Sequence, residues 1–276
     1  MDSPVLAAIP PFFLPFKRVG VGTALVLVHG YLGGSGQWDA QLPFLSQYFE
    51  VVTLDLAGYG VARHMAAPTN LADHARNVLA TLDHMGIERF HLLGHSMGGM
   101  VAQEITRQAP HRVNKLVLYA TGPVGCIPGR FETMAQSRQR LRDDGVQRTA
   151  SRICATWLLD CEASPAYEAL AELATQASEQ AASAGLSAME SWDGRDHLGR
   201  IKQATLVIWG ESDRTYGWSQ IEILWRCIPR ASLAVLPACS HALHLERSVL
   251  FCTVLVEFLG QGENKDQTKA YLFEAN

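Results

Sequence analysis

The sequence lacks three features that would each mark a class of function. It has no run of about 18 apolar residues, so no segment is long enough to cross a bilayer as a helix. Basic residues are not in excess, because 23 Lys and Arg stand against 27 Asp and Glu, for a formal net charge of −4. This balance provides no electrostatic surface for a nucleic acid or an anionic membrane. We therefore expect neither partner.

Metal-binding and secretion patterns are also missing. None of the six cysteines belongs to a CxxC pair, and no Cys/His cluster has the spacing of a zinc site. The first 20 residues contain an apolar run, but they lack a basic start and prolines at 10, 11 and 15 interrupt them, unlike a signal peptide. We expect reduced thiols, no bound metal and a cytoplasmic location.

The composition and the pattern of apolar residues indicate a large α/β domain. The 276 residues are 48% hydrophobic and 18% charged, typical of a folded globular chain. Runs such as ALVLVHG, which ends at a glycine, are typical of strands covered on both faces. Strands are expected at 24–30, 49–60, 90–94, 113–122, 204–210 and 232–237, and helices at 70–86, 97–109, 217–228 and 246–259. This alternation predicts parallel strands joined by helical crossovers.

The alternation stops at Gly122-Pro123, and no strand pattern recurs before about residue 200. Within this interval a helix is expected over 164–185, with Ser164 as its N-cap, proline next and glycine at its end. The letters SAME, at 187–190, have the spacing of a capping box. We predict that residues 123–199 form an all-helical cap, and that residues 1–122 and 200–276 form the α/β core.

A serine stands between two glycines in FHLLGHSMGGMVAQEI (90–105), where a strand must turn into a helix. A nucleophilic serine needs this position, because a tight turn lifts its hydroxyl clear of the backbone. Gly94 and Gly98 stand where a Cβ would collide with the neighbouring helix or strand. The helix N-terminus also helps to stabilise an oxyanion. We predict that Ser96 is a nucleophile; an idle serine in a Gly-rich turn is the alternative.

A serine nucleophile requires a base, normally a histidine that a carboxylate orients. His241 follows the last strand pattern, at the edge of the sheet where ligands bind in open α/β folds. We favour it over His244, which is expected to support the same loop. Asp213, in the loop after strand 204–210, is the predicted acid, and Glu211 is the alternative.

The order serine, aspartate, histidine along the chain, together with the turn at the serine, resembles the α/β-hydrolase superfamily over about residues 12–260. HGYLGGSGQW (29–38) is similar to the His-Gly loop of that family. DLAGYG (55–60) is similar to its Asp-x-Pro-Gly-x-Gly turn, with Ala57 in place of the proline.

The resemblance implies an α/β-hydrolase fold, in which helices flank a mostly parallel central sheet and the cap is inserted after the sixth strand. It also implies that the backbone N–H groups of Tyr31 and Met97 form an oxyanion hole. No cofactor is expected, since the chemistry of such a site needs none.

A serine at the turn argues against the dehalogenase and epoxide-hydrolase branches, which use aspartate there. The cap and residues 188–213 are similar to enol-lactone hydrolases of aromatic catabolism, to small carboxylesterases and to C–C hydrolases of 2-hydroxy-6-oxo-dienoates. The C–C hydrolases usually carry Asn before the serine and Trp after the histidine, where this chain has His95 and Ala242. We expect hydrolysis of an ester or (enol-)lactone of a small organic molecule. C–C hydrolysis is the alternative, and a fold that only binds its ligand is a remote one.

The cap is expected to determine the substrate. Trp157, Met189 and Trp192 are candidates for an apolar pocket wall, although such residues at helical spacing more often belong to a core. Arg130, one of several arginines early in the cap, is a candidate partner for a substrate carboxylate; a solvated helix face is the alternative. The oligomeric state is left open, with a homodimer among the options.

Overall fold

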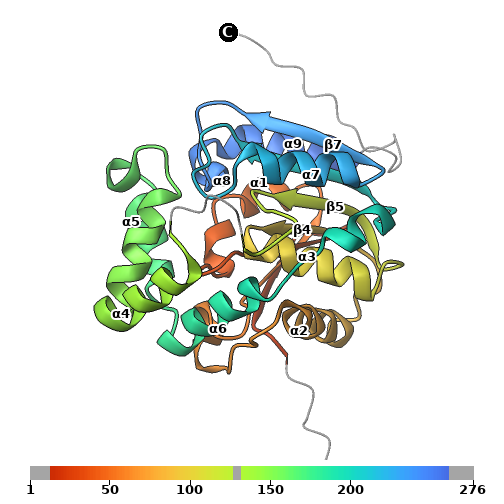
Figure 1. Ribbon diagram of the computed structural model, residues 1–276. Coiled ribbons are helices and arrows are strands. Elements are labelled where there is room, and N and C mark those ends of the chain that lie inside the picture. The colour runs from red at the N-terminus through yellow and green to blue at the C-terminus, as the bar shows by residue number, and fades with distance from the viewer. Residues whose placement is uncertain (1–12, 127–131, 261–276) are drawn as a thin grey trace, which may run out of the picture.

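The computed structural model describes residues 13–126 and 132–260 (Figure 1). At its centre is a seven-stranded sheet in the order β1-β3-β2-β4-β5-β6-β7. The strands are β1 (Phe16–Val19), β2 (Ala24–Val28), β3 (Glu50–Leu54), β4 (Phe90–His95), β5 (Val113–Tyr119), β6 (Ala204–Gly210) and β7 (Ala231–Leu236). β1 pairs antiparallel with β3, and the other neighbouring pairs are parallel. The predicted mostly parallel sheet is confirmed.

Helices cover both faces of this sheet. Successive side chains of a strand point to opposite faces, so a strand that is apolar throughout needs a covering layer on each face. The core helices are α1 (Leu42–Leu45), α2 (Leu71–His84), α3 (Met97–Gln108), α7 (Trp218–Cys227), α8 (Leu243–Glu246) and α9 (Ser248–Gly260), with 3₁₀ turns η1 (Ser35–Trp38) and η2 (Gly60–His64). Val26 of β2 belongs to the buried cluster that includes α2, α3 and α7, whereas its neighbour Leu27 belongs to the cluster that includes α1 and α9. The strand that reads as continuously apolar is therefore buried on both sides.

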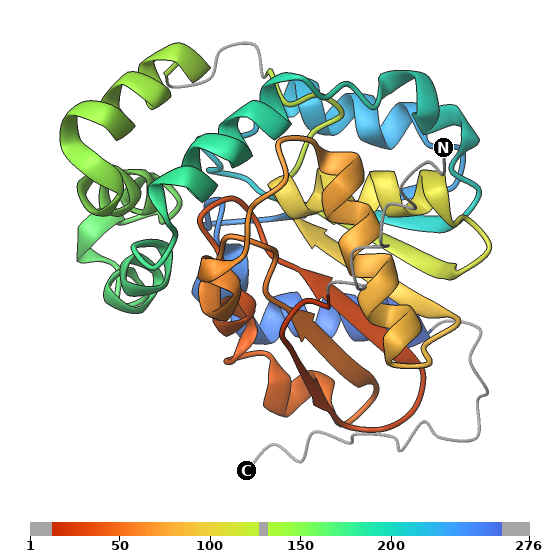
Figure 2. The same cartoon turned by 90° about the horizontal axis from the view of Figure 1, so that it is seen from below.

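The cap consists of α4 (Met134–Thr156), η3 (Cys161–Ala163), α5 (Tyr167–Ala174), α6 (Glu179–Glu190) and η4 (Arg195–Arg200). α4 and α5 project from one side of the core in both views (Figures 1 and 2). A β-bridge between Val124 and Asp193 joins the two ends of the insertion. In the described chain the insertion follows β5, the fifth strand, which corrects the predicted position after a sixth. None of the described helices is long and apolar enough to cross a membrane.

Two local predictions within the cap are wrong. The segment 164–185 forms α5 and part of α6 instead of a single helix. Ser178, not Ser164, caps α6, since its hydroxyl accepts a hydrogen bond from the N–H three residues later. Residues 187–190 lie inside α6, so they are no capping box. Gly185 lies inside α6 as well, which means that a glycine at the end of the pattern did not mark the end of a helix.

Candidate active site

Ser96 occupies the turn between β4 and α3 with φ 55° and ψ −120°, a backbone conformation that residues with a side chain rarely adopt. A Cβ on Gly94 would overlap the carbonyl of Gly98. A Cβ on Gly98 would overlap the carbonyl oxygens of Val28 and His29 at the end of β2. Backbone therefore lies directly against backbone on both sides of the serine, and the predicted need for both glycines is confirmed.

Contacts from the last residue of β5 and from Thr121, two residues after it, hold the strained turn in place. The N–H of Ser96 donates to the carbonyl of Tyr119 at 2.9 Å, and the Oγ1 of Thr121 donates to the carbonyl of Ser96 at 2.7 Å. Thr121 also explains a third glycine, since a Cβ on Gly99 would lie 2.5 Å from the Thr121 side chain. Sequence reasoning missed Thr121, because it belongs to no local motif and its partner lies 25 residues earlier in the chain.

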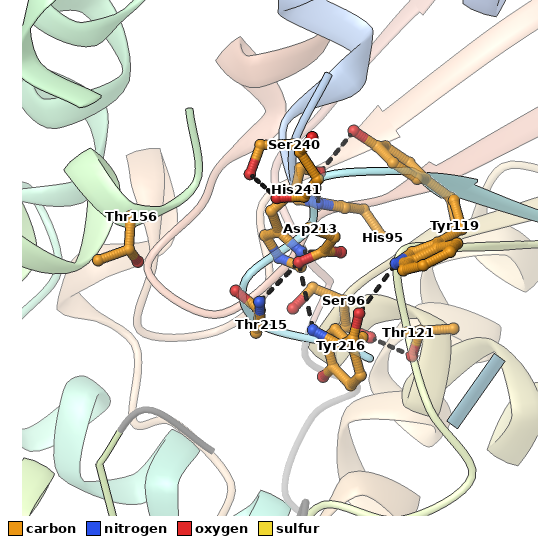
Figure 3. Close-up of polar contacts among 12 residues, drawn as sticks. His95, Ser96, Tyr119, Thr121, Thr156, Asp213, Thr215, Tyr216, Ser240 and His241 are labelled. Carbon is orange, nitrogen blue, oxygen red and sulfur yellow. Dashed lines mark hydrogen bonds and ion pairs between the residues drawn. The ribbon is translucent and has the colours of Figure 1, made fainter. Parts of the chain in front are cut away.

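The predicted acid and base meet at the carboxyl edge of the sheet (Figure 3). Nδ1 of His241 donates to Oδ2 of Asp213 at 3.0 Å, and both side chains are fully buried. Oδ1 of Asp213 accepts from the N–H groups of Thr215 at 2.7 Å and Tyr216 at 3.2 Å. These bonds fix the carboxylate, and the carboxylate in turn fixes the tautomer of His241 with its proton on Nδ1. Nε2 is therefore left with a free lone pair.

Glu211 and His244, the alternatives for the acid and the base, have other hydrogen-bond partners. The carboxylate of Glu211 accepts from the N–H of Ala238 at 3.4 Å, in an exposed turn. Nδ1 of His244 lies 2.7 Å from the hydroxyl of Tyr119. Burial, and then the neighbouring His241, lower the pKa of His244 to about 3. His244 is thus a neutral residue that supports the loop, as predicted.

Ser96 and His241 both lie at this edge (Figure 3). The ring of His95, which precedes the serine, is 4.7 Å from the ring of His241. Nε2 of His241 is buried and has no hydrogen-bond partner among the described residues. Hydrogen bonds of this kind are often long before substrate binds. The bond from Ser96 Oγ to Nε2 therefore stays a prediction.

The predicted oxyanion donors lie on the loops around the serine. Met97 is the first residue of α3, where an N–H group has no partner within its own helix. His29 orders the loop that carries Tyr31: its Nδ1 donates to the carbonyl of Gly30 at 2.8 Å, and its Nε2 accepts from the N–H of Leu56 at 2.9 Å. Burial lowers the pKa of His29, so it is neutral. The role of the two N–H groups stays a prediction.

The four pocket candidates have different surroundings. The ring of Trp157 is 5.8 Å from the ring of His241, so this side chain borders the base. The indole of Trp192 instead donates to Glu104 on α3 at 3.0 Å, a contact that ties the cap to the core. Met189 is buried in the same cluster as α2 and α3, and Arg130 lies outside the described residues.

Residues that sequence reasoning missed connect the cap to the loops of the acid and the base. The carboxylate of Glu246 accepts from the N–H of Leu159 in the cap and from the N–H of Ser240, next to His241, at 2.6 Å each. The guanidinium of Arg214, next to Asp213, donates to two carbonyls of the cap at 3.0 Å. The ring of Tyr216 also stacks on the ring of His241 at 5.7 Å. An aromatic residue just after the predicted acid was the available signal for Tyr216.

In the described chain, no group of three or more His, Cys, Asp or Glu side chains is placed to hold a metal ion. The side chains that converge at the edge of the sheet are instead a serine, a histidine and an aspartate. Their arrangement suits nucleophilic attack on a carbonyl carbon, with the histidine as base.

Comparison with known proteins finds hydrolases that are similar over most of this chain. The chain is 27% identical to a 2-hydroxy-6-oxo-6-phenylhexa-2,4-dienoate hydrolase of Comamonas testosteroni, with 91% of this chain and 92% of that protein covered. It is 31% identical to a pimeloyl-[acyl-carrier protein] methyl ester esterase of Nitrosomonas europaea, with 82% and 91% covered. Among solved structures, a thermophilic esterase from Thermogutta terrifontis matches with a TM-score of 0.81 and 26% identity, over 90% of this chain and 93% of that one.

Residues 23–248 match the family described as alpha/beta hydrolase fold. This range includes the turn at Ser96, the cap, and the loops that carry Asp213 and His241. Because the match covers most of the chain, the chain belongs to the α/β hydrolase fold family and is a hydrolase of that fold.

Proposed function

We propose that this hydrolase cleaves a carboxylic ester or a lactone of a small organic substrate through a covalent acyl-enzyme at Ser96. A lactone is a cyclic ester, so the same attack opens it. The observation that carries the proposal is the buried hydrogen bond between His241 and Asp213, together with a serine in a strained turn at the same edge of the sheet. Each of the three groups then has a defined role.

In the first half of the reaction, Nε2 of His241 takes the proton of the Ser96 hydroxyl while Oγ attacks the carbonyl carbon. The N–H groups of Tyr31 and Met97 stabilise the negative oxygen of the tetrahedral intermediate. The ester C–O bond then breaks, and His241 gives its proton to the leaving alcohol. Asp213 remains ionised throughout and stabilises the imidazolium.

In the second half, His241 takes a proton from water, and the resulting hydroxide attacks the acyl carbon. The bond to Ser96 Oγ breaks, and the serine recovers its proton from His241. The products are a carboxylate and an alcohol, or a hydroxy acid when the substrate is a lactone.

Two comparisons favour ester hydrolysis. The methyl ester esterase of Nitrosomonas europaea is more similar in sequence, at 31% identity, than the dienoate hydrolase. The solved structure reported above is also an esterase. C–C hydrolysis is the second candidate, because the dienoate hydrolase is similar over more of both chains. His95 and Ala242 argue against it, since they replace the Asn and Trp that such enzymes usually carry.

The test measures hydrolysis of p-nitrophenyl acetate and labelling by a fluorophosphonate in the wild type, in Ser96→Ala and in the matched variant Ser232→Ala. Ser232 is exposed on β7. We expect Ser96→Ala to lose labelling and at least about 10³-fold in turnover, with Ser232→Ala unchanged. Activity that survives Ser96→Ala would place the chemistry elsewhere.

The same proteins then receive a short ester, an enol lactone and a 2-hydroxy-6-oxo-dienoate. A kcat/KM that is highest on the dienoate would select the second candidate. A wild type that binds these compounds without turnover, and that no fluorophosphonate labels, would indicate a binding protein instead.

A further inference from the structure

We infer that Tyr119 and His95 are positioning residues. They donate hydrogen bonds to the backbone carbonyl of His241, while Asp213 accepts a hydrogen bond from its ring. The hydroxyl of Tyr119 lies 2.9 Å from the carbonyl oxygen of His241, and Nε2 of His95 lies 3.2 Å from the same oxygen. This inference rests on the proposed function, because it assigns the two residues to the orientation of the proposed base.

The sheet itself places the two donors side by side. His95 is the last residue of β4 and Tyr119 the last residue of β5, and the two are register partners in the parallel pair. Their rings stack with centroids 4.4 Å apart, and both side chains are buried. The carbonyl of His241 is thus fixed to the ends of two inner strands of the sheet, although His241 itself belongs to a loop.

The hydrogen bonds determine where the protons of His95 lie. A carbonyl oxygen only accepts, so Nε2 of His95 carries its proton and donates it to His241. Nδ1 then has a lone pair, which accepts from the side-chain amide of Gln37 at 3.2 Å. Gln37 lies in η1, on the loop after β2, so a third segment of the core supports the arrangement.

The proton of Tyr119 can be placed by the same argument. Its hydroxyl also contacts Nδ1 of His244 at 2.7 Å and accepts from the N–H of His244 at 3.2 Å. If Nδ1 of His244 donates to the hydroxyl, the hydroxyl is free to donate to His241. The opposite choice would leave the 2.9 Å contact between the hydroxyl and the carbonyl oxygen of His241 without a proton, because a carbonyl only accepts. Tyr119 therefore donates to His241.

Both supports are neutral near pH 7. Burial, and then the nearby His241, lower the pKa of His95 well below its ordinary value, and burial raises the pKa of Tyr119 well above its own. A neutral donor pair suits this place, because His241 becomes a cation during the reaction and a second cation behind it would oppose that change. The pair therefore fixes the base without adding charge.

The test removes one hydroxyl. Tyr119→Phe keeps the ring and its stack on His95, but the carbonyl of His241 loses a donor. We expect the rate of acylation by p-nitrophenyl acetate, and of labelling by a fluorophosphonate, to fall about 10- to 100-fold with KM within about twofold, because the base is displaced rather than the pocket. His95→Gln, whose amide can still donate, is expected to keep more activity than His95→Leu.

The matched control is Thr106→Val, which also removes a buried hydroxyl that donates to a backbone carbonyl, at 2.8 Å within α3. We expect it to leave both rates unchanged. If Tyr119→Phe reacts as fast as the wild type, or if Thr106→Val slows the reaction equally, the inference is wrong. In that case labelling of the wild type at Ser96 still supports the proposed function.

A second measurement does not depend on activity. Proton NMR follows the Nδ1 proton of His241, which is hydrogen-bonded to Asp213, in the wild type and in Tyr119→Phe. We expect its exchange with water to be at least about tenfold faster in the variant, because the loop opens more readily. Equal exchange would overturn the inference even if no ester were ever hydrolysed.

Discussion

The polar side chains beside His241 in the core and those of the cap are held in opposite ways. In the core, His95 and Tyr119 are buried, neutral and hydrogen-bonded to the backbone carbonyl of His241. In the cap, the carboxylate of Glu132 pairs with Arg140 at 2.9 Å and with Arg152 at 3.1 Å, and the two arginines are partly exposed. Ion pairs near the surface are weakened by water and salt, whereas buried directional hydrogen bonds are not. We therefore expect the core to fix the geometry of the proposed reaction, and changes in the cap to affect its chemistry less.

Their glycines differ in the same way. At Gly98 in the core an added methyl group would meet backbone, the carbonyls of Val28 and His29. At Gly185 in the cap it would meet the outer parts of two side chains, the hydroxyl of Tyr59 and the ring of Tyr31. Backbone cannot move away without distorting the sheet, whereas the two tyrosine side chains can shift at the cost of the hydrogen bonds that their hydroxyls donate to α6. Equivalent substitutions at the two sites thus test whether the contrast holds.

Gly98→Ala is expected to have the largest effect. The methyl group would push the start of α3 away from β2 and shift Ser96, and a displacement of about 1 Å can lower a rate about 100-fold. We expect kcat/KM on p-nitrophenyl acetate to fall at least about 100-fold. The free energy of unfolding in urea is expected to fall by about 2–3 kcal/mol, as for overpacking in a tight core.

Gly185→Ala is the matched variant in the cap. Alanine favours a helix interior by about 1 kcal/mol over glycine, which offsets part of the strain against the two tyrosines. We expect kcat/KM within about fivefold of the wild type and a change in unfolding free energy below about 1 kcal/mol. Equal losses in the two variants would mean that the cap is packed as rigidly as the core.

Acid is expected to weaken the core through His74, a buried residue of α2. Burial, and then nearby His29, lower its pKa to about 4. In the unfolded chain the pKa is near 6.5, so between these values the unfolded state binds a proton that the folded state does not. Stability is therefore lost as the pH falls from about 7 toward 4.

Between pH 7 and pH 5 this single group removes about 2 kcal/mol from the free energy of unfolding. Urea titrations at the two pH values measure the difference. In His74→Gln we expect the dependence on pH to shrink by that amount, whereas His111→Gln, at an exposed position, should keep it. A wild type whose stability is the same at both values would show that His74 is not held neutral by burial.

The sequence predicted the core well because its elements follow from local patterns. β2 and β4 were expected from apolar runs, and strands buried on both faces need such runs wherever they occur. The turn at Ser96 was expected from two glycines, whose absent side chains are required by contacts a few residues away and at the end of β2. His241 and Asp213 were expected because loops at one edge of a parallel sheet converge.

The cap and the supporting residues were harder to predict, because tertiary contacts decide them. Gly185 resembles a helix end in sequence, but it lies inside α6 where two tyrosines of the core approach it. Tyr119 and Glu246 belong to no motif, and their partners lie 122 and 87 residues away along the chain. No local rule connects such pairs, so only the folded chain identifies them.

Glu246 lies at the boundary between the two regions, and its substitution tests how tightly they are joined. Its two carboxylate oxygens accept one N–H from the cap and one from the residue before His241. In Glu246→Gln one oxygen is replaced by an NH₂ group, which faces an N–H and cannot accept from it. We expect a loss of about 1 kcal/mol for this half-buried group, and a melting temperature lower by roughly 3 °C.

The matched variant Glu257→Gln, at an exposed position of α9, is expected to leave the melting temperature unchanged. The separate effects of Glu246→Gln on kcat and on KM then show what the contact between the cap and the His241 loop does. If Glu246 mainly seats the cap, KM rises and kcat is kept, because the pocket wall shifts while the base stays on the carbonyl contacts of β4 and β5. If kcat falls instead, the loop of His241 depends on the cap for its position, and the separation between a rigid core and an adjustable cap fails at this residue.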